Sequence, residues 1–111
     1  MSKVNQVAIY LCVKSANDAV AFYQEVFGAE ESFRMTEPNG RIGHLEMHLG
    51  PHTLMLSEEF PEMNVLAQPP GTSPASTIYL NVDDCDAVCA AAKQAGATLA
   101  NDPEDQFKGY T

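Results

Sequence analysis

An internal repeat constrains the fold of this 111-residue chain more than any other feature of its sequence. The letters Ile-Tyr-Leu-Cys-Val at residues 9–13 return as Ile-Tyr-Leu-Asn-Val at residues 78–82, 69 positions later. Two shorter matches follow in the same order, 68 positions apart: Asp-Ala-Val at 18–20 and 86–88, and Gly-Ala at 28–29 and 96–97. Three matches in one order and at nearly one spacing indicate a duplicated unit.

Each copy of the repeat begins with an expected strand. Branched aliphatic residues alternate with other residues along 9–13 and along 78–82, which is the period-two pattern of a strand with two different faces. We expect the aliphatic face to pack under a helix. Tyr10 and Tyr79 hold the same place on the opposite face in the two copies.

An expected helix follows each of these strands. In the first copy, Ser15 and Asp18 resemble a capping box, and Gly28 is well placed to end the helix. In the second copy, the helix is expected from near residues 83–84 to Gly96. The acidic residues of its first turn suit the positive end of the helix dipole better than a calcium site, because no EF-hand spacing accompanies them.

Three further strands are expected after the first helix, over about 31–35, 42–49 and 53–57, with turn-forming residues between them. The first copy therefore has the order β-α-β-β-β and spans about residues 5–58. A linker over about 59–75, rich in Pro, Gly, Ser and Thr, leads to a partial second copy over about 76–111. We expect an α+β fold of paired βαβββ modules, in one domain over 1–111, with the second module truncated at its C-terminal end.

The incomplete second copy carries an expectation about assembly. One strand is expected at about 98–101, and no length follows it for the two strands that would complete the copy. A sheet edge left open pairs readily with a neighbour. We expect the final strands to be either truncated or supplied by another chain, and hence a homodimer or a strand-exchanged assembly.

Charge and composition exclude several partners. Six basic residues against fifteen acidic residues give a net charge of −9, which repels nucleic-acid phosphates and anionic lipids. Apolar runs are too short to span a membrane and no leader pattern is present, so a cytoplasmic location is expected. Three cysteines, an odd number, argue against a disulfide framework. Cys85 and Cys89 are interpreted as packing residues rather than as soft-metal ligands.

Several segments resemble a known superfamily. Residues 8–13, 19–23 and 26–30 are similar to the opening of vicinal-oxygen-chelate domains, the group of glyoxalases, bleomycin-resistance proteins and extradiol dioxygenases. A narrower resemblance, to the PhnB-like branch, rests on residues 43–47, 54–63 and 104–109. The resemblance implies paired βαβββ modules that curve around a concave, ligand-binding face. It says less about function, because one fold serves many chemistries.

The resemblance also locates the metal ligands of the metal-using members. These lie in the first, fourth, fifth and eighth strands, and the matching places here hold Ala8, Met55 and Thr77, with no eighth strand in the chain. Alanine has no donor atom, methionine is a soft thioether, and threonine is a poor ligand for a hard divalent ion. We therefore expect no metal and no other cofactor, although a divalent ion at other residues stays an alternative.

One strand concentrates the candidate polar chemistry. His44, Glu46 and His48 occupy alternate positions and so project from one face of the strand. On one face, residues two positions apart in the sequence are separated by about 6.6 Å, and residues four positions apart by about 13 Å. His44 and His48 are therefore too far apart to share an ion, whereas His44 and Glu46 are not. A polar face in water, a ligand pocket and a metal site are all open interpretations of this pattern.

The other candidates would complete a pocket for a small organic ligand. Tyr10 and Tyr79 offer flat apolar walls with a polar tip, or else fill the core beneath the sheet. Met55 and Ser57 alternate on the same side of the fourth strand and add a pliable wall and a hydroxyl. The predicted function is metal-independent binding of a small hydrophobic or aromatic molecule, with no catalytic residue identified. The alternative is a metal-dependent lyase, isomerase or dioxygenase with unusual ligands, such as His44 and Glu46.

Overall fold

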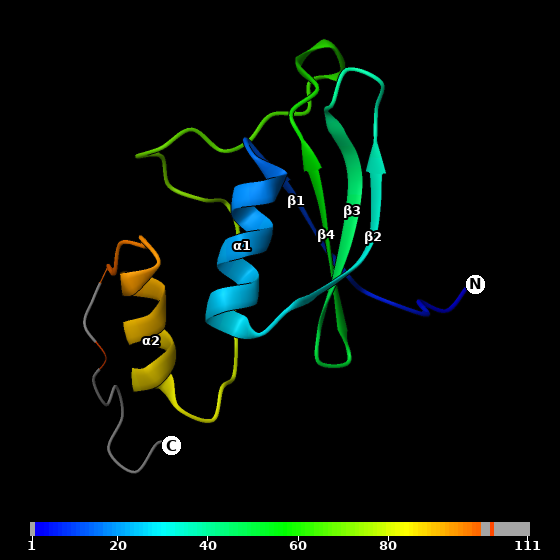
Figure 1. The fold of residues 1–111 in the computed structure, drawn as a ribbon. Helices are drawn as coiled ribbons and strands as arrows, with labels where there is room; N and C mark the ends of the chain where they lie inside the picture. The colour runs from blue at the N-terminus through cyan, green and yellow to red at the C-terminus, as the bar shows by residue number, and fades with distance from the viewer. Residues whose placement is uncertain (1, 101–102, 104–111) are drawn as a thin grey trace. The chain divides into compact units, whose positions relative to one another are not determined.

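A computed structural model of the protein describes residues 2–100 and 103 (Figure 1). The chain forms two compact units, Met1–Thr77 and Ile78–Thr111, and each is described by itself. No helix in the described part of the chain is long and apolar enough to cross a membrane.

The first unit is a βαβββ module built on a four-stranded sheet. Its elements are β1 (Ile9–Val13), α1 (Ala16–Phe27), β2 (Glu30–Thr36), β3 (Ile42–Leu49) and β4 (His52–Glu58). The strand order is β1-β4-β3-β2, in which β1 runs parallel to β4 and the other neighbours are antiparallel. The predicted α+β class and the predicted order of elements in this module are confirmed.

Helix α1 begins and ends where local chemistry dictates. The Ser15 side chain accepts a hydrogen bond from the Asp18 backbone N–H at 3.2 Å, which satisfies a donor in the first turn. At the other end, Gly28 adopts φ 67° and its N–H donates to the Gln24 carbonyl. That left-handed conformation suits glycine, which has no Cβ to clash.

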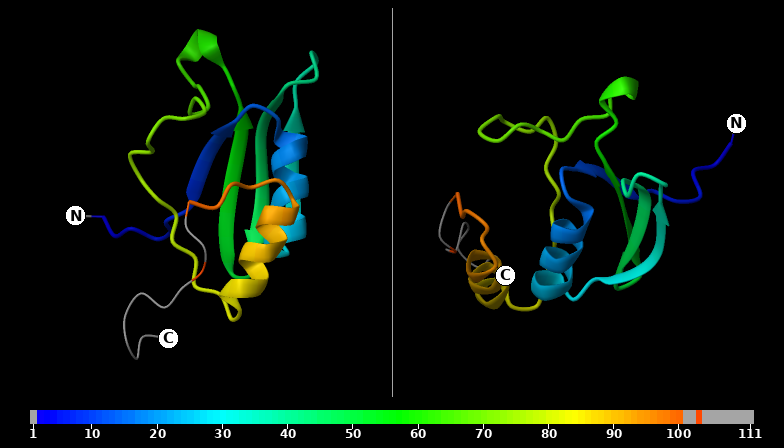
Figure 2. Two further views of the ribbon diagram at one scale, coloured as in Figure 1. Left: turned by 90° about the vertical axis from the view of Figure 1, so that its left-hand side faces the viewer. Right: turned by 45° about the horizontal axis from the view of Figure 1, so that its top comes forward.

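Helix α1 lies against one face of the sheet (Figure 2), and the core of this unit is packed between the two. Leu45, Met47 and Leu56 are fully buried there. They pack in one cluster with Ala16 and Val20 of the helix. Because side chains alternate along a strand, the residues between these apolar positions project from the opposite face of the sheet.

The strand register aligns side chains on that opposite face. Met55 of β4 pairs with Tyr10 of β1 on one side and with Glu46 of β3 on the other. Glu46 pairs in turn with Phe33 of β2. Cross-strand partners share a face, so these four side chains form one row across the sheet.

The linker after β4 contains hydrogen-bonded structure at its start. A short 3-10 helix, η1, spans Pro61–Met63. Phe60 and Val65 form an isolated antiparallel bridge, with the Phe60 N–H donating to the Val65 carbonyl at 2.8 Å. The segment 60–65 is therefore a closed turn that returns towards the end of β4.

The second unit differs from the expectation at its first strand. Helix α2 (Cys85–Gln94) forms as predicted, and the Asp84 side chain accepts from the Ala87 N–H at 3.0 Å to cap it. Residues 78–82, however, form no strand, and Tyr79 is 75% exposed. A strand needs a neighbour to satisfy its backbone N–H and C=O groups, and the described part of this unit contains no other strand.

Two further expectations concern the end of the chain. Residues 98–100 are not in a strand, which departs from the strand expected at about 98–101. Residue 101 lies outside the described residues. The PhnB-like stretch at 104–109 also lies outside them.

Candidate functional site

Five of the six predicted ligand-binding residues lie on one face of the sheet, away from α1. They come from three neighbouring strands: Tyr10 from β1, His44 and Glu46 from β3, and Met55 and Ser57 from β4. The register brings them together because β4 lies between β1 and β3. Tyr79 belongs to the second unit, which is described by itself, so its part in a common site stays a prediction.

Three of these side chains are linked in a row of hydrogen bonds. His44 Nε2 lies 2.8 Å from Glu46 Oε2, and His44 Nδ1 lies 3.0 Å from the Tyr10 hydroxyl. The spacing of two residues along β3 predicted that the imidazole and the carboxylate share a face. The bond to Tyr10 crosses from β3 over β4 to β1, and only the strand order reveals it.

Aromatic rings hold the His44 imidazole from two sides. Its ring centroid lies 5.5 Å from that of Tyr10 and 6.0 Å from that of Phe33, at tilted angles. The His44 side chain is 23% exposed and the Glu46 side chain 36%. The imidazole is thus fixed in orientation by two hydrogen bonds and two ring contacts, yet the group stays accessible to a ligand.

A hollow of about 520 Å³ opens beside Tyr10 in the first unit. This volume falls within the range of small-ligand pockets, roughly 300–1,000 Å³. The floor comes from β1 and β4, and the wall comes from the turn 60–65. The lining residues are Tyr10, Cys12, Ser57, Phe60, Met63 and Val65. Phe60, Met63 and Val65 are apolar, and Tyr10, Cys12 and Ser57 add a phenol, a thiol and a hydroxyl.

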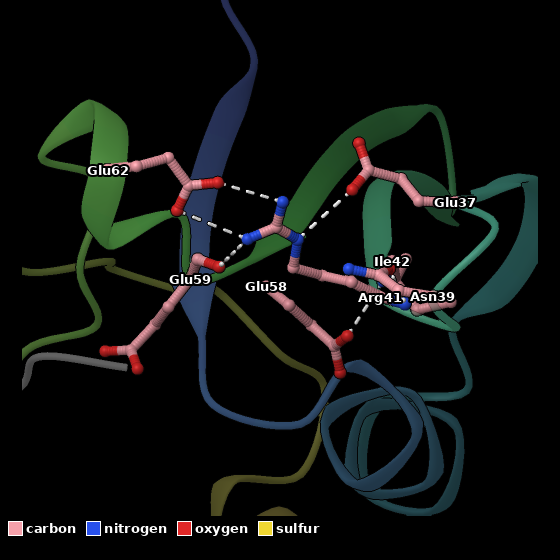
Figure 3. Close-up of polar contacts among 7 residues, drawn as sticks. All are labelled: Glu37, Asn39, Arg41, Ile42, Glu58, Glu59 and Glu62. Carbon is pink, nitrogen blue, oxygen red and sulfur yellow. Dashed lines mark hydrogen bonds and ion pairs between the residues drawn. The ribbon is translucent and has the colours of Figure 1, made fainter.

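Arg41 fixes the wall of this hollow from the start of β3. Its guanidinium carbon lies 3.7 Å from the centroid of the Phe60 ring. Its nitrogens pair with Glu37 at 3.1 Å and with Glu62 at 3.0 Å, as Figure 3 shows. The Arg41 guanidinium in turn lowers the pKa of the Glu62 carboxyl through this hydrogen bond. One cation therefore joins the turn before β3 to η1.

Two carboxylates after Ser57 complete the anchoring. Glu58 accepts hydrogen bonds from the backbone N–H groups of Ala16 at 2.9 Å and Ile42 at 2.8 Å, the latter drawn in Figure 3. Glu59 accepts from the Ala67 N–H at 2.9 Å. The end of β4 and Glu59 directly after it are thus tied to the start of α1, to the start of β3 and to the linker.

The Cys12 thiol at the base of the hollow is shifted towards its neutral form. Burial raises the pKa of Cys12, and the negative charge of Glu59 raises it further, while a hydrogen bond with Ser57 acts in the opposite direction. A thiol with a raised pKa is a weak nucleophile at neutral pH. Cys12 therefore contributes packing and a weak hydrogen bond to the hollow.

The donor groups on this face do not fit a hard divalent ion. Both ring nitrogens of His44 already have partners, and Met55, between Tyr10 and Glu46, offers only a thioether. Across residues 2–100 and 103, no group of three or more His, Cys, Asp or Glu side chains is placed to hold a metal ion. The polar groups of this face are bonded to one another rather than arranged around an ion.

Several residues of the hollow were not predicted from the sequence. Cys12 was visible as the next residue on the face of Tyr10, two positions along β1. Phe60, Met63 and Val65 lie in the segment that the sequence predicts as a linker, where the composition singles out no individual residue. What marks this segment as a wall is the pairing of Arg41 with Glu37 and Glu62, and only the folded structure brings these residues together.

Comparison with known proteins reveals relatives over nearly the whole chain. The family model described as Glyoxalase/Bleomycin resistance protein/Dioxygenase superfamily matches residues 3–111. An uncharacterized protein of Mycobacterium bovis is 35% identical over 104 residues, which are 90% of this chain and 68% of that protein. Two uncharacterized proteins of Mycobacterium tuberculosis match at the same identity, and the chain spans 61% of their length.

Solved structures share the fold. A gene product of Arabidopsis thaliana is similar with a TM-score of 0.60 and 26% identity, over 86% of this chain and 76% of that one. The fosfomycin resistance protein FosX of Listeria monocytogenes, complexed with Mn(II) and a dihydroxypropylphosphonic acid, has a TM-score of 0.65 and 17% identity, over 86% and 73%. At that identity, the second likeness shows the fold alone.

Proposed function

The chain belongs to the glyoxalase/bleomycin resistance protein/dioxygenase superfamily, and on this premise we propose that it binds a small hydrophobic or aromatic molecule without a metal ion. The observation that carries the proposal is the hollow of about 520 Å³ that Tyr10 and the turn 60–65 line. Apolar walls with a few placed polar groups are the usual character of a small-ligand site.

The chemistry of the lining favours a flat ligand. Tyr10 and Phe60 present aromatic rings, and Met63 adds a flexible side chain that adapts to the shape of its partner. Met63 is 70% exposed in the free protein, so a ligand in the hollow would cover apolar surface that now faces water. The hydroxyl of Ser57 and the phenol of Tyr10 supply the polar contacts.

Metal independence is supported by the donors themselves. The resemblance to the metal-using members of the superfamily places their ligands at positions that Ala8, Met55 and Thr77 hold here. The imidazole of His44 is engaged at both nitrogens. We infer that binding energy comes from apolar burial and hydrogen bonds rather than from coordination.

The proposal also covers the branch of the superfamily to which the chain belongs and its oligomeric assembly. The segments at 43–47 and 54–63 support membership of the PhnB-like branch. We propose that the two copies of the repeat act as one domain over 1–111 and that the chain forms a homodimer or a strand-exchanged assembly. Tyr79 would then contribute to the pocket, as the repeat predicts.

A fluorescence titration tests the binding proposal. The probe is N-phenyl-1-naphthylamine, a neutral aromatic dye whose emission rises in an apolar site. Saturable binding is expected, and Met63→Glu should weaken it by about tenfold or more, because the new carboxylate would lie against the dye. Leu66→Glu is the matched control, since Leu66 is exposed in the same linker but does not line the hollow.

The proposal fails if the dye does not saturate, or if Met63→Glu and Leu66→Glu bind it equally well. The alternative function is a metal-dependent lyase, isomerase or dioxygenase with unusual ligands such as His44 and Glu46, whose side chains lie 2.8 Å apart. Stoichiometric metal in the purified protein, lost together with an activity in His44→Ala, would establish that alternative.

A further inference from the structure

For a neutral His44 imidazole beside an ionised Glu46, the two bonded partners of the ring assign one tautomer. A carboxylate oxygen only accepts hydrogen bonds, so the contact of 2.8 Å with Glu46 requires a proton on His44 Nε2. In the neutral imidazole, Nδ1 is then an acceptor. The Tyr10 hydroxyl, 3.0 Å away, is therefore the donor to Nδ1.

This order of donors is that of a relay. A carboxylate orients the imidazole, the imidazole accepts a proton from a hydroxyl, and the hydroxyl oxygen keeps its lone pairs for another partner. Tyr10 alone belongs both to the relay and to the lining of the hollow. A ligand in the hollow would therefore meet the relay at the Tyr10 oxygen.

We propose that Tyr10, His44 and Glu46 form a metal-free proton relay that removes an acidic proton from an aromatic ligand bearing a phenolic or enolic hydroxyl or an enolisable C–H. The inference rests on the proposed function, because the ligand must first occupy the hollow. It goes further by assigning the ligand a chemical class and the protein a general-base activity.

The proton balance of the step is closed. The ligand O–H or C–H bond breaks, and its proton forms a new O–H bond on the Tyr10 oxygen. The former Tyr10 proton moves to His44 Nδ1, so the imidazole becomes a cation beside the Glu46 carboxylate and the ligand becomes an anion. Return of the proton to a different atom of the ligand completes a tautomerisation. Nothing is oxidised or reduced.

The surroundings of the relay suit this role. The rings of Tyr10 and Phe33 hold the imidazole so that its two nitrogens stay aimed at their partners. His48, two residues beyond Glu46, lies on the same face of β3 and is exposed. His48 therefore offers a matched control, being a histidine of the same strand and face that lies outside the relay.

The test uses 4-nitrophenol, whose anion and neutral form absorb at different wavelengths. At a pH where the free probe is mostly neutral, the phenolate band should rise saturably with added protein. The ratio of anion to neutral phenol should be about tenfold or more higher for the bound probe than for the free probe. Tyr10→Phe should abolish the rise, even at 4-nitrophenol concentrations that displace N-phenyl-1-naphthylamine from this variant. Glu46→Gln should diminish the rise, and His48→Gln should leave it unchanged.

The outcomes separate the two proposals. If the dye does not bind, the proposed function fails and the relay with it. If the dye binds but 4-nitrophenol does not displace it, only the relay is overturned. The same holds if 4-nitrophenol binds but shows no phenolate band, or shows a band that Tyr10→Phe leaves unchanged. Independently, ¹⁵N spectra of the ligand-free protein should show His44 protonated at Nε2, and a proton on Nδ1 alone would overturn the relay.

Discussion

The guanidinium carbon of Arg41 lies 3.7 Å from the centroid of the Phe60 ring, so a cation at the start of β3 holds an aromatic wall of the hollow. Arg41→Met should release the turn 60–65, because it removes the stacking contact together with the pairs to Glu37 and Glu62. Affinity for N-phenyl-1-naphthylamine should fall by about fivefold to tenfold. Titration of the dye measures this.

Arg41→Lys is the matched control for charge. A lysine keeps the positive charge but loses the planar fork that pairs with two carboxylates and stacks on a ring. The affinity of Arg41→Lys for N-phenyl-1-naphthylamine should therefore lie between the affinities of the unchanged protein and of Arg41→Met. Equal dye binding by all three proteins would show that Arg41 does not support the wall.

The Arg41–Glu62 pair should give the protein a dependence on acid. The guanidinium lowers the pKa of Glu62 from its ordinary 4.5. A carboxyl with a folded-state pKa below its unfolded value contributes stability that is complete above the unfolded pKa and is lost as the pH falls through the folded pKa. The stability advantage of the unchanged protein over Glu62→Gln should therefore be present at neutral pH and vanish below the folded pKa.

Urea unfolding of the two proteins at a series of pH values measures this difference. Glu30→Gln, in which an exposed carboxyl of β2 is neutralised, controls for the change in net charge. An advantage that grows as the pH falls would contradict the sign of the shift.

Glu58 should matter more for stability than its place at the end of a strand suggests. Its carboxylate accepts from the N–H groups of Ala16 and Ile42, which begin α1 and β3. Glu58→Ala leaves both donors without this partner and should lower the free energy of unfolding by about 1–3 kcal/mol. Chemical denaturation measures the loss. The exposed Glu25→Ala is the control, and equal losses in the two variants would contradict the role of Glu58.

Cys12 should alkylate slowly at neutral pH. Burial and the charge of Glu59 raise its pKa, so little thiolate is present. In a Cys85→Ser, Cys89→Ser background, the rate with iodoacetamide should rise with pH through a midpoint above that of the unfolded chain. Glu59→Gln should lower the midpoint. A midpoint below the unfolded value would contradict the assignment of Cys12 to a packing role.

The elements of the first unit could be predicted because their signals are local. Ser15 and Gly28 mark the ends of α1, and alternation along β1 and β3 separates the buried face from the face of Tyr10 and His44. The adjacency of His44 and Glu46 follows from period-two spacing alone. These features depend on a few neighbouring residues.

Features that depend on distant partners could not be predicted. The bond between Tyr10 and His44 requires the order β1-β4-β3, and the wall at Phe60 requires Arg41 to reach across from β3. Residues 78–82 carry the alternation of a strand, but the described part of their unit contains no strand to pair with, and they form none. Whether residues 78–82 form a strand thus depends on a partner strand and not on their intrinsic strand propensity.

The central claim, that this superfamily member binds an aromatic ligand without a metal ion, is tested most directly by titrating N-phenyl-1-naphthylamine into protein before and after exhaustive chelation, with the metal content measured in both. We expect far less than one metal ion per chain and the same affinity in the two samples. Stoichiometric metal in the first sample, together with binding that disappears after chelation and returns when the metal is restored, would contradict the claim.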